Sequence, residues 1–325
     1  MLPKLIALFP KVQFIITTHS PLFLLGMEEQ FGTEGFEIYE MPQGLKINAE
    51  RFSEFQKAYT YLTNTQQYEQ AIYDAVSNKQ DKMLIVTEGT TDWKHMKAAY
   101  NKLSHMPEYA ELFTGFEFEF LEYEPNNSSQ STKVKLEMGN GQLVSLCENM
   151  AKIMQKRKMV FIADRDHNDT NKKLGGKDGK QFKKWGNNVY SFILPIPDFR
   201  TATPGICIEH LYSDEVIKTE IETQNPNVKR RLYMGNEFDR RGYAPSLGVI
   251  CEKKAVCGPE KINIIEGSTG ERVTLLDDEN INMALSKMTF ANLMLEGKTP
   301  FDEVDFKPFV PIFDILKKIY LDSDI

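Results

Sequence analysis

Residues 83–92 read Met-Leu-Ile-Val-Thr-Glu-Gly-Thr-Thr-Asp, and residues 159–166 read Met-Val-Phe-Ile-Ala-Asp-Arg-Asp. Each stretch begins with a short, uninterrupted apolar run, which is typical of a strand buried on both faces of a sheet. Each run then ends in acidic residues. Residues 189–194 form a third apolar run, and helical patterns separate the three. The sequence therefore predicts an α/β fold in which a parallel sheet is flanked by helices.

Other parts of the sequence add weaker signals. Helical periodicity predicts helices over residues 92–104, 141–157, 280–296 and 308–320. Near the start, residues 12–18 form a β-branched and aromatic run that predicts a buried strand, and residues 36–48 predict a hairpin. Residues 51–79 carry apolar side chains at steps of three and four, which predicts further helices. Residues 251–265 are compatible with a small β-rich excursion.

Composition limits the classes of function. The chain has 325 residues, of which 41% are hydrophobic and 26% are charged, as in a globular protein with a sizeable core. Its 39 basic and 46 acidic residues give a net charge of −7, which excludes nucleic-acid binding by bulk positive charge alone. Its four cysteines form no Cys-x-x-Cys pair, which favours free thiols in a reducing compartment. No apolar stretch reaches the roughly 18 residues of a membrane helix. We therefore expect a cytoplasmic protein without a membrane partner.

The acidic residues after the first two runs form a candidate metal site. Glu88 and Asp92 follow the first run, and Asp164 and Asp166 follow the second. Because ligands of an open parallel sheet bind at the carboxyl ends of its strands, we expect these side chains at one edge. Converging carboxylates repel each other unless a cation lies between them, and hard oxygen ligands suit Mg²⁺ or Mn²⁺. Two such ions about 4 Å apart can activate water and stabilise the leaving oxygen in phosphodiester cleavage.

The same two stretches resemble the signature motifs of the Toprim domain, which topoisomerases, primases and a set of nucleases share. The resemblance covers roughly residues 81–212 and implies a Toprim-type parallel sheet. It also implies that Glu88 acts in acid–base chemistry or metal binding, and that Asp164 and Asp166 bind the metal. Taken alone, a Glu-Gly turn or an Asp-x-Asp pair is more often plain surface, so the interpretation depends on their occurrence together after buried runs.

Residues 13–21, Gln-Phe-Ile-Ile-Thr-Thr-His-Ser-Pro, resemble the switch-histidine loop of an ABC-type ATPase. The resemblance implies that His19 contacts the γ-phosphate of ATP, and the alternative is a histidine in a polar turn. An ATPase end followed by a Toprim domain resembles the OLD (overcoming lysogenization defect) family of ATP-dependent nucleases, many of which act in anti-phage defence. On this interpretation residues 1–80 are an ATPase remnant with linking helices. Residues 81–325 are then a nuclease domain with a mainly helical insertion and extension from about residue 213.

ATP binding by the chain itself is excluded by a missing motif. No Gly-x-x-x-x-Gly-Lys-Ser/Thr loop occurs in the 325 residues, so ATP could act only through an upstream ATPase region. We therefore expect either the C-terminal part of a longer protein or a chain that has lost its ATPase.

Two further site residues are implied by the OLD resemblance. Residues 208–212, Ile-Glu-His-Leu-Tyr, resemble the place of another metal-binding acidic residue, which would be Glu209. A glutamate at a helix start is an equally good interpretation. Residues 286–291, Ser-Lys-Met-Thr-Phe-Ala, resemble the segment whose lysine stabilises charge in the transition state, which would be Lys287. A cation near the scissile phosphate spreads negative charge, and the alternative is an ordinary lysine on a helix face.

The segment Asn171–Lys184, here called the basic segment, follows the second acidic pair. It holds one aspartate and six lysines, at Lys172, Lys173, Lys177, Lys180, Lys183 and Lys184. Three glycines within it predict a flexible loop. Beside a metal site such a loop would grip phosphates and make binding depend on salt, and the alternative is a solvated surface loop.

Together these observations predict a divalent-metal-dependent endonuclease that cuts or nicks DNA. Asp164 and Asp166 would hold metal, Glu88 and Asp92 would hold metal or the attacking water, and Lys287 would face the developing charge. The resemblance further implies a homo-oligomer and a helicase, a reverse transcriptase or another defence-system protein as partner. One alternative is a Toprim RNase that acts on RNA such as tRNA. The other is a non-catalytic module that assembles with or senses a partner.

Overall fold

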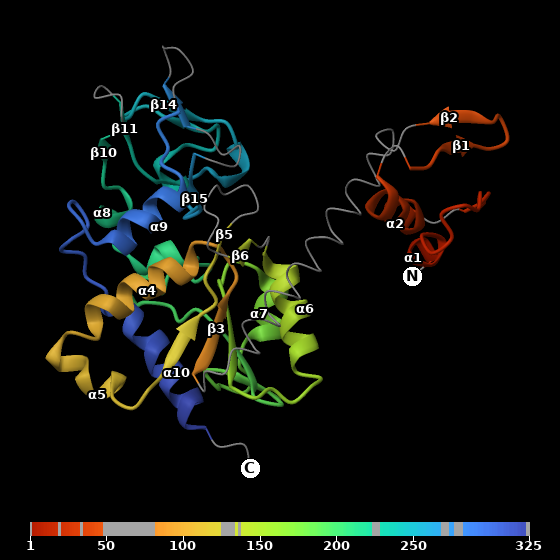
Figure 1. Cartoon of the computed structure of the whole chain (residues 1–325). Coiled ribbons are helices and arrows are strands. Elements are labelled where there is room, and N and C mark those ends of the chain that lie inside the picture. The colour runs from red at the N-terminus through yellow and green to blue at the C-terminus, as the bar shows by residue number, and fades with distance from the viewer. Residues whose placement is uncertain are drawn as a thin grey trace. The chain divides into compact units, whose positions relative to one another are not determined.

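The computed structural model describes residues 2–18, 21–32, 35–47, 82–124, 134–135, 138–222, 228–267, 273–275 and 282–322. The chain divides into two compact units, Met1–Tyr73 and Asp74–Ile325 (Figure 1). Among the described residues, no helix combines the length and the apolar character that crossing a membrane requires.

The first unit contains two helices and a hairpin: α1 (Leu2–Ile6), α2 (Pro21–Phe31), β1 (Ile38–Glu40) and β2 (Leu45–Ile47). Helix α1 packs against α2, and β1 pairs antiparallel with β2, which confirms the hairpin. The strand predicted over residues 12–18 is wrong, because this segment has no regular secondary structure and its Ile15 is 91% exposed. An apolar run forms a strand only when another strand accepts its backbone, and none of the described strands pairs with it. Both His19 and the helices predicted over 51–79 lie outside the described residues.

The second unit is built on a five-stranded sheet with the order β4-β3-β7-β9-β8. Its strands are β3 (Met83–Thr87), β4 (Phe118–Phe120), β7 (Met159–Ala163), β8 (Lys183–Gly186) and β9 (Val189–Ile193). The first four in that order run parallel, and β8 joins the edge antiparallel. Every residue of β3 and β7 is buried, as expected for strands covered on both faces. The predicted α/β fold with a parallel sheet is confirmed.

Helices cover both faces of this sheet. They are α4 (Asp92–Leu103), α6 (Asn140–Met150), α7 (Asn168–Leu174) and α10 (Val310–Leu321). Figure 1 shows α6 and α7 on one side and α4 and α10 on the other. Because side chains alternate along a strand, Met83 and Ile85 share one apolar core with residues of α4 and α10, such as Ala99 and Phe313.

Two helices are shorter than their periodicity predicts. The helix predicted over 141–157 ends at Met150, because Asn187 donates a hydrogen bond to Ala151 O and the Gln155 N–H donates to Asn187 O. These bonds turn the chain toward the start of β7. The helix predicted over 280–296 is α9 (Lys287–Glu296). It begins late because Ser286 caps it.

Between Ser213 and Ser286 the chain forms small antiparallel sheets. Their strands are β10 (Ile221–Glu222), β11 (Lys229–Arg230), β12 (Tyr233–Met234), β13 (Tyr243–Ala244), β14 (Val249–Cys251), β15 (Ile264–Ile265) and β16 (Val273–Leu275). The prediction of a mainly helical C-terminal part is therefore wrong for this segment, which we call the β-rich excursion. The expectation of a small β-rich excursion at residues 251–265 agrees with the structure. The strands of the excursion are two or three residues long, too short to show the alternation that identifies a strand in a sequence. After the excursion, α9 packs against α4.

Candidate functional site

Glu88 and Asp164 lie side by side because their strands end at the same level. In the parallel pair β3–β7, Thr87 lies opposite Ile162, so Glu88 comes one position and Asp164 two positions after the last paired residues. The backbone N–H of Asp164 donates to Glu88 Oε2 at 3.3 Å. The edge that the sequence predicts for these carboxylates is thus the edge where the structure brings them together.

Asp92 reaches the same edge from the first turn of α4. The N–H of Gly89 donates to Asp92 Oδ2 at 2.7 Å, and Thr91 Oγ1 lies 3.4 Å from Asp92 Oδ1. A Cβ atom at residue 89 would lie only 2.7 Å from Asp92 Oδ1. Glycine is therefore required at this turn if the carboxylate is to fold back over it.

Asp166 is placed differently from Asp164. After Asp164 the chain bends, because the Arg165 N–H donates to Ile206 O at 2.8 Å and Arg165 Nε donates to Leu194 O at 2.8 Å. The two aspartates consequently do not continue an extended strand. Asp164 is half-buried, whereas Asp166 is exposed.

The carboxyl groups at this edge share one electrostatic field. Burial, followed by the negative charges of Asp92 and Asp166, raises the pKa of Glu88 to about 8. Burial and the charge of Glu209 raise the pKa of Asp92 to about 6. Burial and the charges of Asp92 and Glu88 also raise the pKa of Asp164 well above its ordinary value. These carboxyl groups thus hold their protons to a higher pH than free carboxyl groups do.

Glu209 and Lys287 form an ion pair. Glu209 lies in the short 3₁₀ helix η4 (Ile208–Leu211), its side chain is fully buried, and Lys287 Nζ lies 3.1 Å from its Oε2. Burial alone would raise the pKa of Glu209, but Lys287, His95 and the Cys207 thiol outweigh it and lower the pKa to about 2. Burial likewise disfavours the charge on Lys287, but Cys207 and Glu209 hold the pKa of Lys287 well above its ordinary value.

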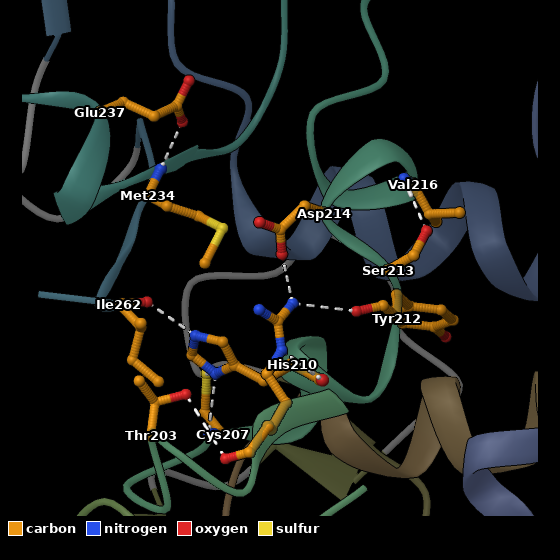
Figure 2. A network of polar contacts seen from close by, with 11 residues as sticks. Thr203, Cys207, His210, Tyr212, Ser213, Asp214, Val216, Met234, Glu237 and Ile262 are labelled. Atoms are coloured by element: carbon orange, nitrogen blue, oxygen red, sulfur yellow. Dashed lines mark hydrogen bonds and ion pairs between the residues drawn. The ribbon is translucent and has the colours of Figure 1, made fainter. Parts of the chain in front are cut away.

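A polar network fixes η4 (Figure 2). His210 Nδ1 accepts the Cys207 N–H at 3.0 Å, so its other ring nitrogen, Nε2, is the donor to Ile262 O at 2.7 Å. Arg200 donates to Tyr212 O at 3.2 Å and to Asp214 Oδ1 at 2.5 Å. Hydrogen bonds therefore hold η4 in place both before and after Glu209.

The start of α9 is also held in place. Ser286 Oγ accepts the Thr289 N–H at 3.0 Å, and Glu266 Oε2 accepts the Lys287 N–H at 3.3 Å. Both bonds satisfy N–H groups that a helix leaves unpaired in its first turn. Further along, Lys94 of α4 donates to Asn292 of α9 at 2.6 Å. The position of Lys287 therefore depends on α4 and on the β-rich excursion.

Sequence reasoning missed three residues of this region: His95, Cys207 and Glu266. His95 lies three positions after Asp92, hence on the same face of α4, and this spacing is the signal that could have found it. Cys207 directly precedes residues 208–212 and Glu266 lies in a segment that resembles no motif, and only the fold brings these two to Lys287.

The basic segment is the predicted loop only over residues 175–182, which have no helix or strand. Its first part lies in α7, which His167 caps by accepting the Thr170 N–H, and its last part lies in β8, which pairs with β9. Lys183 Nζ lies 3.2 Å from the centre of the Trp185 ring, and Lys184 Nζ lies 3.0 Å from Asp322 Oδ2. The other lysines are exposed: Lys172, Lys173, Lys177 and Lys180. The three glycines of the segment lie in the irregular stretch between α7 and β8.

Within the described ranges, no three His, Cys, Asp or Glu side chains are arranged to hold a metal ion. Comparison of the chain with protein-family models, with curated proteins and with solved structures finds no match. The Toprim and OLD interpretations therefore stay predictions made from sequence motifs.

Proposed function

We propose that the chain is a divalent-metal-dependent endonuclease of the Toprim type, from the OLD family, that cuts or nicks DNA. One observation carries this proposal: Glu88, Asp92 and Asp164 meet at the carboxyl end of a parallel sheet, and burial together with the charges of neighbouring carboxylates raises the pKa of each. A protein seldom gathers uncompensated carboxylates in one place unless a ligand or a reaction uses them.

The chemistry of the donor set fits Mg²⁺ or Mn²⁺. The donors are carboxylate oxygens, which these hard cations prefer. Lys287, whose charge acts on Asp92 and Asp164, is already paired with Glu209, so it leaves these two carboxylates without a full counter-charge. Asp92, Asp164 and Asp166 would hold the cations, joined by Glu88 once it is ionised. Because Glu209 has its own cation, its predicted role as a metal ligand is the weaker part of the assignment.

When bound, the divalent cations would activate a water molecule and stabilise charge on the leaving oxygen. Glu88 accepts the Asp164 N–H at Oε2, which leaves its Oε1 for proton exchange with water. A group whose pKa lies near 8 can both take up and release a proton near neutral pH. Lys287 would face the negative charge that develops on the phosphate, and Glu209 would keep the ammonium in place.

The exposed lysines of the basic segment support DNA as the substrate. Lys172, Lys173, Lys177 and Lys180 follow directly after the acidic pair in sequence and project a local positive charge from a protein of net charge −7. Phosphate contacts of this kind position a duplex without reading its sequence. The proposal further includes an ATPase remnant at residues 1–80, control by ATP through an upstream region, a homo-oligomer, a cytoplasmic location and a defence-system partner.

The deciding experiment compares cleavage of supercoiled plasmid and of total tRNA with Mg²⁺, with Mn²⁺ and with EDTA. We expect nicking or cutting of the plasmid that EDTA abolishes and that Asp164→Asn reduces at least a hundredfold. Asp314→Asn, which changes an exposed carboxylate of α10, is the matched control and keeps full activity. Equal cleavage by wild type and Asp164→Asn would refute the site assignment, and cleavage of tRNA alone would identify an RNase instead.

One observation favours a second function, that of a non-catalytic module. The described part of the chain presents no preformed set of three metal ligands. Titration calorimetry with Mn²⁺ distinguishes the two functions: the nuclease binds the ion and Asp164→Asn weakens the binding, whereas a module that only senses a partner binds no ion.

A further inference from the structure

Two buried atoms near Lys287 lack a hydrogen-bond partner in the described part of the chain. They are Nε2 of His95 and Oε1 of Glu209, and both side chains are fully buried. An unpaired polar atom in a protein interior is costly, so two such atoms in one region call for an explanation.

The hydrogen bond of His95 Nδ1 determines which of the two ring nitrogens carries the proton. His95 Nδ1 lies 2.9 Å from Tyr212 Oη. Tyr212 is buried, and among the described residues its hydroxyl makes no other hydrogen bond. The hydroxyl therefore donates to Nδ1, since the reverse arrangement would leave its own proton without an acceptor. The imidazole proton then lies on Nε2, and burial, which lowers the pKa of His95 to about 4, keeps the ring neutral.

The two unpaired atoms are complementary. Nε2–H is a donor, and a carboxylate oxygen such as Glu209 Oε1 can only accept. The two groups also lie within electrostatic range, because the charge of Glu209 raises the pKa of His95 and His95 lowers that of Glu209. Helix α4, which carries His95, contacts η4, which carries Glu209.

We propose that His95 is a positioning residue for Glu209: its Nε2–H donates to Oε1, across a small side-chain rotation or one water molecule, while Lys287 Nζ holds Oε2. Tyr212, His95, Glu209 and Lys287 then form one chain of polar contacts from the core to the ammonium. The effect on cleavage rests on the proposed function, whereas the hydrogen bond itself does not.

The hydrogen bond is tested by NMR of wild-type protein labelled with ¹⁵N at its five histidines. His95→Gln assigns the signal by its disappearance. We expect His95 to be the Nε2–H tautomer between pH 6 and 8, with a slowly exchanging proton, and its Nε2 signal to shift in Glu209→Gln. The signal of His105, which is exposed, serves as the control and stays unchanged. An Nδ1–H tautomer, or an Nε2 signal that ignores Glu209→Gln, would overturn the proposal.

The consequence for cleavage is tested with variants at the same position. His95→Leu removes the donor, and we expect kcat to fall about tenfold with KM little changed, as for other residues that orient a site residue. His95→Gln supplies an N–H donor at a similar place and recovers most of the loss. If kcat falls equally in His95→Leu and His95→Gln, and both variants unfold at the same temperature, the donor role is overturned. If wild type cleaves nothing, the proposed function fails, and the NMR result still decides the role of His95.

Discussion

Lys287 Nζ lies 3.1 Å from Glu209 Oε2, although 78 positions of sequence separate the two residues. The lysine side chain is 32% exposed and the glutamate side chain 1%, so the ion pair joins a partly exposed cation to a buried carboxylate. This pairing divides the acidic groups of the site into two classes. Glu209 has an ion-pair partner, whereas Glu88, Asp92 and Asp164 have none in the described part of the chain.

Replacing Lys287 should show how much the stability of the fold depends on its ion pair with Glu209. Lys287→Met leaves Glu209 buried and unpaired. We therefore expect the free energy of unfolding at pH 7 to fall by about 2 kcal/mol. Breaking a fully buried pair typically costs about 3–5 kcal/mol, and the loss is smaller here because Lys287 is partly exposed. Urea unfolding measures it. Lys298→Met, which breaks a pair on the surface, is the control and should cost less than about 0.5 kcal/mol.

A double variant separates stability from activity. Lys287→Met combined with Glu209→Gln removes both charges, so stability should return toward the wild-type value. Cleavage should not return, because no cation then faces the phosphate. If the double variant is as unstable as Lys287→Met alone, the loss of stability does not come from the unpaired charge of Glu209.

The raised pKa of Glu88 predicts how stability depends on pH in metal-free protein. The folded protein keeps this proton up to about pH 8, whereas the unfolded chain releases it near pH 4.5. The stabilisation is therefore complete below pH 4.5 and is lost as the pH rises to about 8. Glu88→Gln should flatten this decline by several kcal/mol, since each pKa unit corresponds to about 1.4 kcal/mol. Urea unfolding at several pH values in EDTA measures it. An unchanged slope would show that Glu88 is ionised throughout.

Gly89 should matter for the site more than for the fold. In Gly89→Ala the new Cβ would lie 2.7 Å from Asp92 Oδ1, so the carboxylate must move. We expect Mn²⁺ affinity, measured by calorimetry, to fall at least tenfold, while thermal unfolding changes little. The matched control is Gly141→Ala in α6, where a Cβ meets no atom within 4 Å. Its metal affinity should stay at the wild-type value.

The exposed lysines of the basic segment should determine the salt dependence of DNA binding. For each of Lys172, Lys173, Lys177 and Lys180 that contacts a phosphate, replacement by Gln should reduce the slope of log K against log salt by about 0.9. Fluorescence anisotropy at several salt concentrations measures it. Lys183→Gln is the comparison: its ammonium lies on the Trp185 ring, so the slope should hardly change. Equal slopes for all variants would remove this segment from the DNA-binding surface.

The sequence predicts the sheet well because burial on both faces leaves an unmistakable pattern. Met83–Thr87 and Met159–Ala163 are apolar at nearly every position, and both are strands over those bounds. The position of Glu88 and Asp164 follows from the parallel pairing alone, since parallel strands end at one edge. These parts of the site are local consequences of the strands.

The remaining parts depend on contacts between distant segments, which periodicity does not record. The partner of Glu209 is fixed by the packing of α9 on α4, and the ring of His95 is oriented by Tyr212. The lysine-rich segment suggests a loop, but the edge of the sheet recruits its end as β8. Residues 12–18 show the converse case, because this apolar run pairs with none of the described strands and is irregular.

The long route of the chain between Asp92 and Lys287 bears on how the protein is made. A ribosome delivers the acidic edge early and the lysine much later, after the β-rich excursion whose Glu266 receives the Lys287 N–H. A nascent or prematurely terminated polypeptide thus displays the carboxylates of the edge before Lys287 has been synthesised. Under the proposed function, such a polypeptide has no complete site until the β-rich excursion and α9 have folded.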